Sequence, residues 1–189
     1  MEQKHGFSLW QIAGLIVTAV ILLETPAYSQ TSSVEGTWRL VARDLPDGTH
    51  ITPPQVMGMF SLAKGQRNLN VLWYTPEGKP ASYSLMSTYT LTNREYTETL
   101  LFSIFNDPGN PQTPIYNLSG ETKTMPVTSE GRKISIKLPF DAPTVEFDGD
   151  RLTATVEGVF VDHWEKIKFS DTTWGQECWL AYDRYERWR

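Results

Sequence analysis

The feature that most constrains the fold of this chain is an alternation of apolar and polar residues with a period of two, which recurs from residue 36 onward. In segment 132–138 the apolar residues are Ile134, Ile136 and Leu138, and the residues between them are lysine and serine. Successive side chains of a β-strand point to opposite faces, so this pattern predicts strands with one buried and one solvated face. Helical periodicity is almost absent after residue 30, and the chain is therefore predicted to be all-β.

Short stretches rich in Gly, Pro, Asn or Asp separate these segments and favour tight turns between antiparallel neighbours. The longest break, Asn106 to Pro114, contains three prolines and is expected to form a wide loop. A closed barrel and a two-sheet sandwich both satisfy the pattern. The expected strands are Gly36–Arg43, Met57–Leu62, Asn68–Tyr74, Ser82–Thr92, Arg94–Phe105, Ile115–Lys123, Arg132–Leu138, Thr144–Phe147, Arg151–Phe160, His163–Phe169 and Glu177–Tyr185.

Residues 1–29 have the layout of a secretory signal peptide. An uncharged apolar run over 12–23 precedes a proline, and Ala27 and Ser29 are the small residues expected before a cleavage point. As a helix, this run would span about 18 Å, which is short of the ~30 Å hydrocarbon core of a bilayer. Cleavage is therefore favoured over an uncleaved anchor. Residues 30–189 are predicted to form one secreted or periplasmic domain without a transmembrane segment.

Charge and cysteine content narrow the classes of partner. The net charge of the chain is −5, which argues against nucleic acid or an anionic membrane as the main partner. Cys178 is the only cysteine, so no intramolecular disulfide can form and the domain must rely on its core. The sequence leaves the oligomeric state open.

The first expected strand and the turn after it, residues 36–49 (GTWRLVARDLPDGT), resemble the bacterial lipocalin-like domain family. Members of that family often open with a GTW-L-V strand followed by an acidic Asp-Gly turn. Together with the sequential hairpins, the resemblance predicts a single antiparallel up-and-down β-barrel of eight to ten strands. Its lumen is expected to be nearly filled by side chains or to hold one small ligand. The resemblance also implies that Trp38 plugs one end of the barrel, with Arg184 or Arg187 stacked on its ring.

Glu98 is the first candidate for a polar group inside the lumen. The apolar residues of its strand that are expected to share its face are Tyr96, Leu100, Phe102 and Ile104. A buried polar group costs about 1–3 kcal/mol unless it is paired, so an inward carboxylate points to a specific role. The alternative is a β-bulge that turns Glu98 toward solvent.

Two further strands supply candidates. On the segment 163–169, His163 and Glu165 share a face with Ile167, whereas Lys166 and Lys168 mark the opposite face as the wet one. A histidine and a carboxylate about 7 Å apart in one cavity could act as general acid and base, or they could form a simple ion pair at the rim.

On the segment 82–91, Tyr83 and Tyr89 are expected to point inward. Each would bring apolar bulk and a hydroxyl group that could be aimed at a ligand.

These observations predict an exported lipocalin-like protein that binds a small, largely apolar or amphipathic molecule through Glu98, His163, Glu165, Tyr83 and Tyr89. One alternative is an enzyme of the cyclase, isomerase or hydratase type that works inside the lumen. Another is an envelope-associated interaction module with a filled barrel. Because nucleophile signatures, metal-ligand spacings and phosphate-binding loops are absent from the sequence, we expect no metal and no cofactor, and an enzyme is the less favoured reading.

Overall fold

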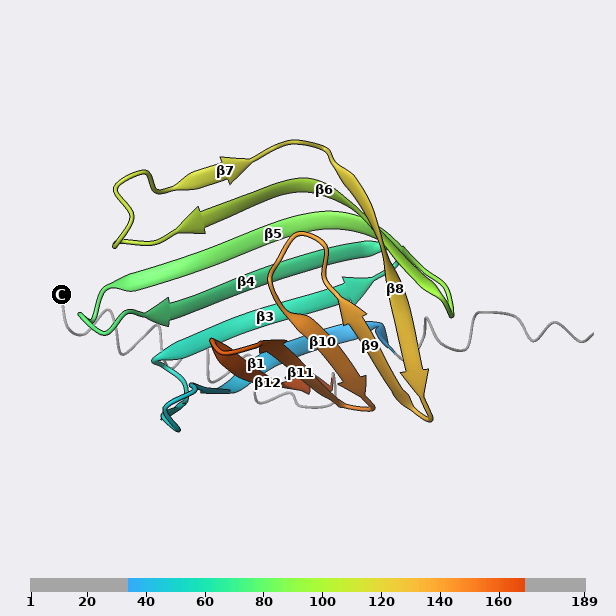
Figure 1. The fold of residues 1–189 in the computed structure, drawn as a ribbon, viewed down its shortest axis with the longest axis horizontal. Coiled ribbons are helices and arrows are strands. Elements are labelled where there is room, and N and C mark those ends of the chain that lie inside the picture. The colour runs from blue at the N-terminus through green and yellow to red at the C-terminus, as the bar shows by residue number, and fades with distance from the viewer. Residues whose placement is uncertain (1–33, 169–189) are drawn as a thin grey trace, which may run out of the picture.

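The structure is a computed structural model that describes residues 34–168, and its regular structure is one antiparallel β-sheet (Figure 1). The strands are β1 (Gly36–Asp44), β2 (His50–Ile51), β3 (Val56–Ala63), β4 (Gln66–Tyr74), β5 (Pro80–Leu91), β6 (Glu95–Asn106), β7 (Ile115–Asn117), β8 (Thr122–Glu130), β9 (Lys133–Lys137), β10 (Thr144–Asp148), β11 (Arg151–Val156) and β12 (Phe160–Lys166).

The sheet closes into a ten-stranded barrel because β12 pairs with β1. Around the ring the order is β1, β3, β4, β5, β6, β8, β9, β10, β11 and β12, so neighbours in sequence are neighbours in space. The short strands β2 and β7 lie off this ring, on β1 and β6 respectively. The predicted all-β, up-and-down antiparallel barrel is therefore confirmed. In Figure 1 the long strands β3 to β6 form one broad wall, and the shorter strands β9 to β11 belong to the other.

Most expected strands within the described residues are present with shifted ends, and two are divided differently in the structure. The segment Ile115–Lys123 is not one strand, because β7 ends at Asn117 and β8 continues far beyond Lys123. The segment Arg151–Phe160 is also not one strand, because β11 ends at Val156 and Phe160 begins β12. The turn between them contains Gly158, whose φ of 71° suits glycine. The expected strand Glu177–Tyr185, the signal peptide and the end of the strand at Phe169 lie outside the described residues.

Trp38 is a fully buried residue of the barrel core, as predicted. Its ring packs against Phe60 and Phe147, with centroid distances of 5.7 and 5.4 Å. A cation also lies on this ring: Lys166 Nζ is 5.1 Å from the centroid. Arg184 and Arg187, the expected capping residues, lie outside the described residues.

Two β-bulges change which residues face the lumen. In β6 an extra residue at Leu101 lets Leu100 pair with Ser87 while Phe102 pairs with Met86. Beyond the bulge Ser103 is buried, so the expectation that Phe102 and Ile104 share the inward face of Glu98 is wrong. One inserted residue reverses the faces of all the residues after it, because the side-chain period of a strand is two.

The second bulge lies in β1, between Leu40 and Ala42. Before it Trp38 and Leu40 point inward, and after it Arg43 does. The bulge thus places a charged side chain on the face that begins with the core tryptophan.

Replacing Trp38 by alanine should lower the free energy of unfolding by about 3–5 kcal/mol, because it removes a fully buried aromatic side chain from a packed core. Urea denaturation followed by circular dichroism measures this loss. Val159→Ala, at a residue that is 54% exposed, is the control and should change the free energy by less than about 0.5 kcal/mol. Equal midpoints for the two variants would contradict the role assigned to Trp38.

Candidate functional site

The lumen holds a cavity of about 630 Å³. Most of its wall is apolar, and the strands contribute Leu69, Val71, Trp73, Phe105, Val145 and Leu152. Its rim comes from connections that follow β1, β4, β6, β9 and β11, through Leu45, Thr75, Asp107, Phe140 and Val159. In an up-and-down barrel these connections share one end, so this end is the mouth of the cavity. The loop after β6 was expected to be wide, and its Asp107 does line the cavity.

Arg67 is the charged residue buried most deeply beside this cavity. Along β4 it is in phase with Leu69, Val71 and Trp73, so alternation carries its side chain into the lumen, where it is completely buried. The guanidinium donates to Glu98 Oε1 on β6 at 2.7 Å and to Asp141 Oδ1 at 3.0 Å, and it makes a second contact with Asp141 through Nη2. The Ser87 hydroxyl donates to the same oxygen of Glu98.

The charges of this cluster stabilise one another. Burial works to lower the pKa of Arg67, but the negative charges of Asp141 and Glu98 raise it above its ordinary value, so the side chain stays cationic. Burial also raises the pKa of the neighbouring Tyr96. The three charged groups depend on one another, because a buried charge that loses its partner destabilises the fold.

The connection between β9 and β10, residues 138–143, reaches across the lumen to the wall that carries Arg67. Three contacts hold it there: the Asp141 ion pair, a hydrogen bond from the Tyr83 hydroxyl to the Phe140 carbonyl at 3.2 Å, and Lys123 Nζ at 4.8 Å from the Phe140 ring centroid. In Figure 1 this loop stands in front of the wall formed by β4 and β5. Burial raises the pKa of Tyr83 to about 12, so its hydroxyl remains a donor at neutral pH.

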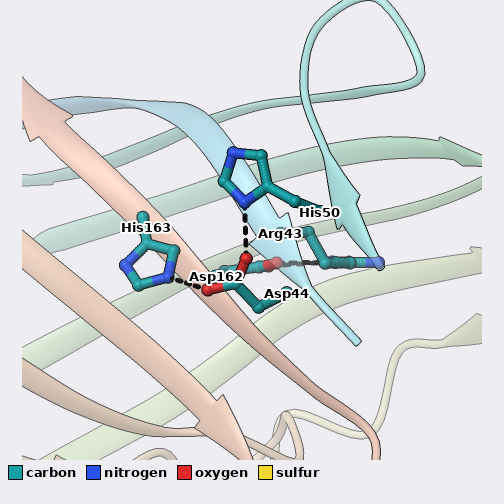
Figure 2. Close-up of polar contacts among 5 residues, drawn as sticks. All are labelled: Arg43, Asp44, His50, Asp162 and His163. Atoms are coloured by element: carbon teal, nitrogen blue, oxygen red, sulfur yellow. Dashed lines mark hydrogen bonds and ion pairs between the residues drawn. The ribbon is translucent and has the colours of Figure 1, made fainter. Parts of the chain in front are cut away.

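A second buried ion pair lies in the wall near the mouth. Arg43 Nε and Nη2 donate to the two carboxylate oxygens of Asp162 at 2.6 and 2.8 Å (Figure 2). The guanidinium carbon of Arg43 also lies 4.1 Å from the ring centroid of Phe160 and 5.7 Å from that of Trp73. Burial raises the pKa of Asp162, and the Arg43 charge opposes this effect. Both side chains line the cavity, and each carboxylate oxygen of Asp162 accepts one hydrogen bond from Arg43.

On the outer side of the same wall, Asp44 bridges two histidines. Its Oδ1 lies 2.6 Å from His50 Nδ1, and its Oδ2 lies 2.7 Å from His163 Nε2 (Figure 2). Hydrogen bonds from His50 and then from His163 lower the pKa of the Asp44 carboxyl. Consecutive residues of β1 and of β12 therefore hold two polar clusters back to back, Arg43 with Asp162 inside and Asp44 with the histidines outside.

The expectation that His163 and Glu165 face the lumen is wrong. Their side chains are 42% and 56% exposed, whereas Asp162 and Trp164 are buried. The cause is the pairing of β12 with β11, which sets Trp164 opposite Leu152 and Asp162 opposite Ala154, both inward residues.

The ring of Trp164 packs against Gly58 of β3. A Cβ atom added at Gly58 would lie 2.8 Å from Trp164 Cη2, so only glycine leaves room for the ring. Burial of this apolar surface decides which face of β12 points inward.

Glu98, Tyr83 and Tyr89 do point inward, but only one of them reaches the cavity. Tyr83 lines it, between the loop at 138–143 and the ring of Phe105 at 6.4 Å. Glu98 is completely buried next to Arg67, and Tyr89 pairs with it across β5 and β6. Among the described residues, neither Glu98 nor Tyr89 belongs to the cavity lining. The five predicted residues therefore do not converge on one site.

Sequence reasoning missed the four residues that form the ion pairs of the lumen, namely Arg43, Arg67, Asp141 and Asp162. A signal for Arg67 was present, because it is in phase with three apolar residues of its strand. Arg43 gave none, since the bulge before it is invisible in the sequence. Asp141 lies in a loop, to which alternation assigns no face.

Within residues 34–168, no group of three or more histidine, cysteine, aspartate and glutamate side chains is arranged to hold a metal ion. Over the same residues, no helix is long and apolar enough to cross a membrane. Comparisons of the chain with protein-family models, with curated proteins and with solved structures found no match.

Arg67→Met should lower the free energy of unfolding by about 3–5 kcal/mol, because it leaves Glu98 and Asp141 buried without a counter-charge. Chemical denaturation measures the loss, and adding Glu98→Gln should restore part of it. Arg39→Met is the control, since Arg39 is exposed and its pair with Glu165 contributes about 0–1 kcal/mol. If Arg67→Met does not fold, Asp141→Asn provides a milder break of the same cluster. Wild-type stability of either Arg67→Met or Asp141→Asn would contradict the role of the cluster.

The Asp44 carboxyl should titrate below its ordinary value of about 3.9 in the folded protein. Because the folded pKa is lowered, Asp44 stabilises the fold above its unfolded pKa and loses this effect as the pH falls through the folded pKa. A pH titration followed by carbon-13 NMR measures the midpoint of the Asp44 carboxyl. His50→Phe should raise this midpoint, and the control Arg39→Gln should leave it unchanged. An unchanged midpoint in His50→Phe would show that the His50 hydrogen bond does not form in solution.

Proposed function

We propose that this chain is an exported protein that binds a small, largely apolar molecule in the lumen of its β-barrel. The observation that carries the proposal is the cavity of about 630 Å³, lined mainly by aliphatic and aromatic side chains. Pockets for small molecules in proteins have volumes of about 300–1,000 Å³ and walls of this composition. The cavity reaches the surface at Tyr74 and Val159, which are 46% and 54% exposed and leave a path for entry.

The charged groups of the lumen favour an uncharged ligand. Both arginines that line the cavity already donate to carboxylates of the chain itself, Arg43 to Asp162 and Arg67 to Asp141 and Glu98. An anionic ligand would have to compete with these carboxylates for the guanidinium groups, at the cost of leaving a buried charge unpaired. The Tyr83 hydroxyl at the cavity wall is a neutral group whose proton goes to the Phe140 carbonyl, and its oxygen could accept a hydrogen bond from a hydroxyl of the ligand.

The two alternatives have less support. An enzyme built on His163 and Glu165 would need these groups in the lumen, and they lie on its outer side. A filled barrel would have no room for a ligand, whereas this lumen retains a cavity. Export rests on the composition of residues 1–29, which lie outside the described residues.

Binding can be tested with N-phenyl-1-naphthylamine, a neutral apolar fluorophore that brightens when it leaves water. We expect saturable binding by the wild-type protein. We expect at least tenfold weaker binding by Ala154→Phe, because Ala154 lines the cavity and a phenyl ring would occupy ligand space. Thr155→Phe adds the same ring to the next residue of β11, on the opposite face, and should bind like the wild type.

Circular dichroism shows whether each variant folds. If Ala154→Phe does not fold, Val71→Phe fills the cavity from another wall in its place. Equal binding by the filled and the control variants would place the probe outside the lumen and overturn the proposal. Absence of binding by the wild type, together with no co-purified small molecule in native mass spectrometry, would do so as well.

A further inference from the structure

Aromatic side chains are concentrated in the lining of the cavity. They make up 12% of the chain but more than a quarter of the lining residues. Trp73 and Phe105 are the next-to-last residues of β4 and β6, and Phe160 is the first residue of β12, so all three lie at the mouth end of their strands. With one residue of β5 and one of the β9–β10 loop they form a set here named the aromatic collar: Trp73, Tyr83, Phe105, Phe140 and Phe160.

Four members of the aromatic collar form a continuous row of contacts. The Trp73 and Phe105 rings are stacked at a centroid distance of 6.3 Å. Tyr83 pairs with Phe105 across β5 and β6, and the centroids of their rings are 6.4 Å apart. The Tyr83 hydroxyl in turn donates to the Phe140 carbonyl. The row therefore runs from β4 to the loop between β9 and β10.

A planar cation extends the aromatic collar from Trp73 to Phe160. The guanidinium carbon of Arg43 lies 5.7 Å from the Trp73 ring centroid and 4.1 Å from that of Phe160. The edge of this guanidinium is paired with Asp162 through Nε and Nη2 (Figure 2). A guanidinium that is paired through its edge still stacks on aromatic rings through its flat faces. Arg43 therefore adds a flat, electron-poor surface to the cavity while its charge stays paired.

The aromatic collar is the accessible part of the cavity lining. Its five members are only partly buried although they line the lumen, whereas the aliphatic residues Leu69, Val71 and Leu152, which lie deeper in the barrel, are buried. Phe60 also lines the cavity and packs against the fully buried Trp38 ring behind it. A ligand that enters through the mouth therefore meets ring faces first, in a cavity that ends against a packed aromatic group.

We propose that the ligand of this cavity is an uncharged molecule with a flat aromatic ring system that stacks on the aromatic collar. The inference rests on the proposed function and names the class of ligand. Aromatic rings attract one another in offset-stacked and edge-to-face arrangements, beyond the effect of burying their surface. A guanidinium such as that of Arg43 also attracts the face of a ring. A saturated molecule in the same place gains mainly the burial of its surface. The collar therefore favours the aromatic molecule.

Two alcohols with the same carbon skeleton test the inference. 2-Naphthol is flat and aromatic, whereas decahydro-2-naphthol is puckered and saturated. Both are uncharged at neutral pH, and each has a hydroxyl that can donate to the Tyr83 oxygen. Displacement of N-phenyl-1-naphthylamine from the wild-type protein measures both dissociation constants. We expect 2-naphthol to bind about tenfold more tightly, although the saturated alcohol is the more hydrophobic of the two.

One ring of the aromatic collar can be removed with a matched control. Phe105→Leu deletes a ring from the collar and keeps an apolar side chain, and Phe102→Leu makes the same change on the outer face of the same strand. Phe105→Leu should weaken the binding of 2-naphthol by about fivefold and that of decahydro-2-naphthol by less than about twofold. Phe102→Leu should leave both unchanged. If circular dichroism shows that Phe105→Leu does not fold, Trp73→Leu repeats the test on β4.

The results separate this inference from the proposed function. Equal affinity of the wild type for the two alcohols, or tighter binding of the saturated one, would overturn the inference and leave a lumen that binds apolar molecules in general. Equal losses for both alcohols in Phe105→Leu would also overturn it, because the ring would then contribute only apolar surface. If neither the fluorophore nor the alcohols bind to the wild type, the proposed function fails and the inference fails with it.

Discussion

The arrangement of the lumen depends on the ion cluster of Arg67, Glu98 and Asp141. It joins β4 to β6 inside the barrel and fastens the β9–β10 loop to the opposite wall. A fully buried guanidinium is tolerated because two carboxylates pair with it, and burying these carboxylates without it would be costly. Since Asp141 lies on the loop that borders the cavity, the same interaction that pairs the charges also ties the loop to the wall that carries Arg67.

The two β-bulges explain how a regular barrel acquires polar groups where alternation would place apolar ones. Beyond the bulge in β1, Arg43 replaces an apolar residue on the inner face and meets Asp162. Beyond the bulge in β6, Ser103 takes the inward position and Phe102 moves outward. Each bulge leaves one residue unpaired and reverses the direction of every side chain after it. A single inserted residue therefore changes which side chains of the rest of the strand face the lumen.

The fold could be predicted from the sequence to a large extent, because strand periodicity and turn residues are local signals. Alternation predicted the inward faces of Tyr83, Glu98 and Ile136, which the structure bears out. It failed on β12, where both faces carry polar residues and the burial of Trp164 against Gly58, on a distant strand, decides the outcome. The partners of Arg67 and Arg43 could not be predicted, since they are joined by loop placement and bulges that depend on the whole barrel.

Because the cavity opens at one end of the barrel, different residues stabilise the core and form the opening. Trp38, Phe60 and Phe147 form a packed aromatic group in the core, whereas turns and loops supply the rim of the cavity. Changes in those connections can reshape the opening without touching the core tryptophan. The shape of the opening can therefore change by substitutions or insertions in these connections, while the residues that stabilise the barrel stay the same.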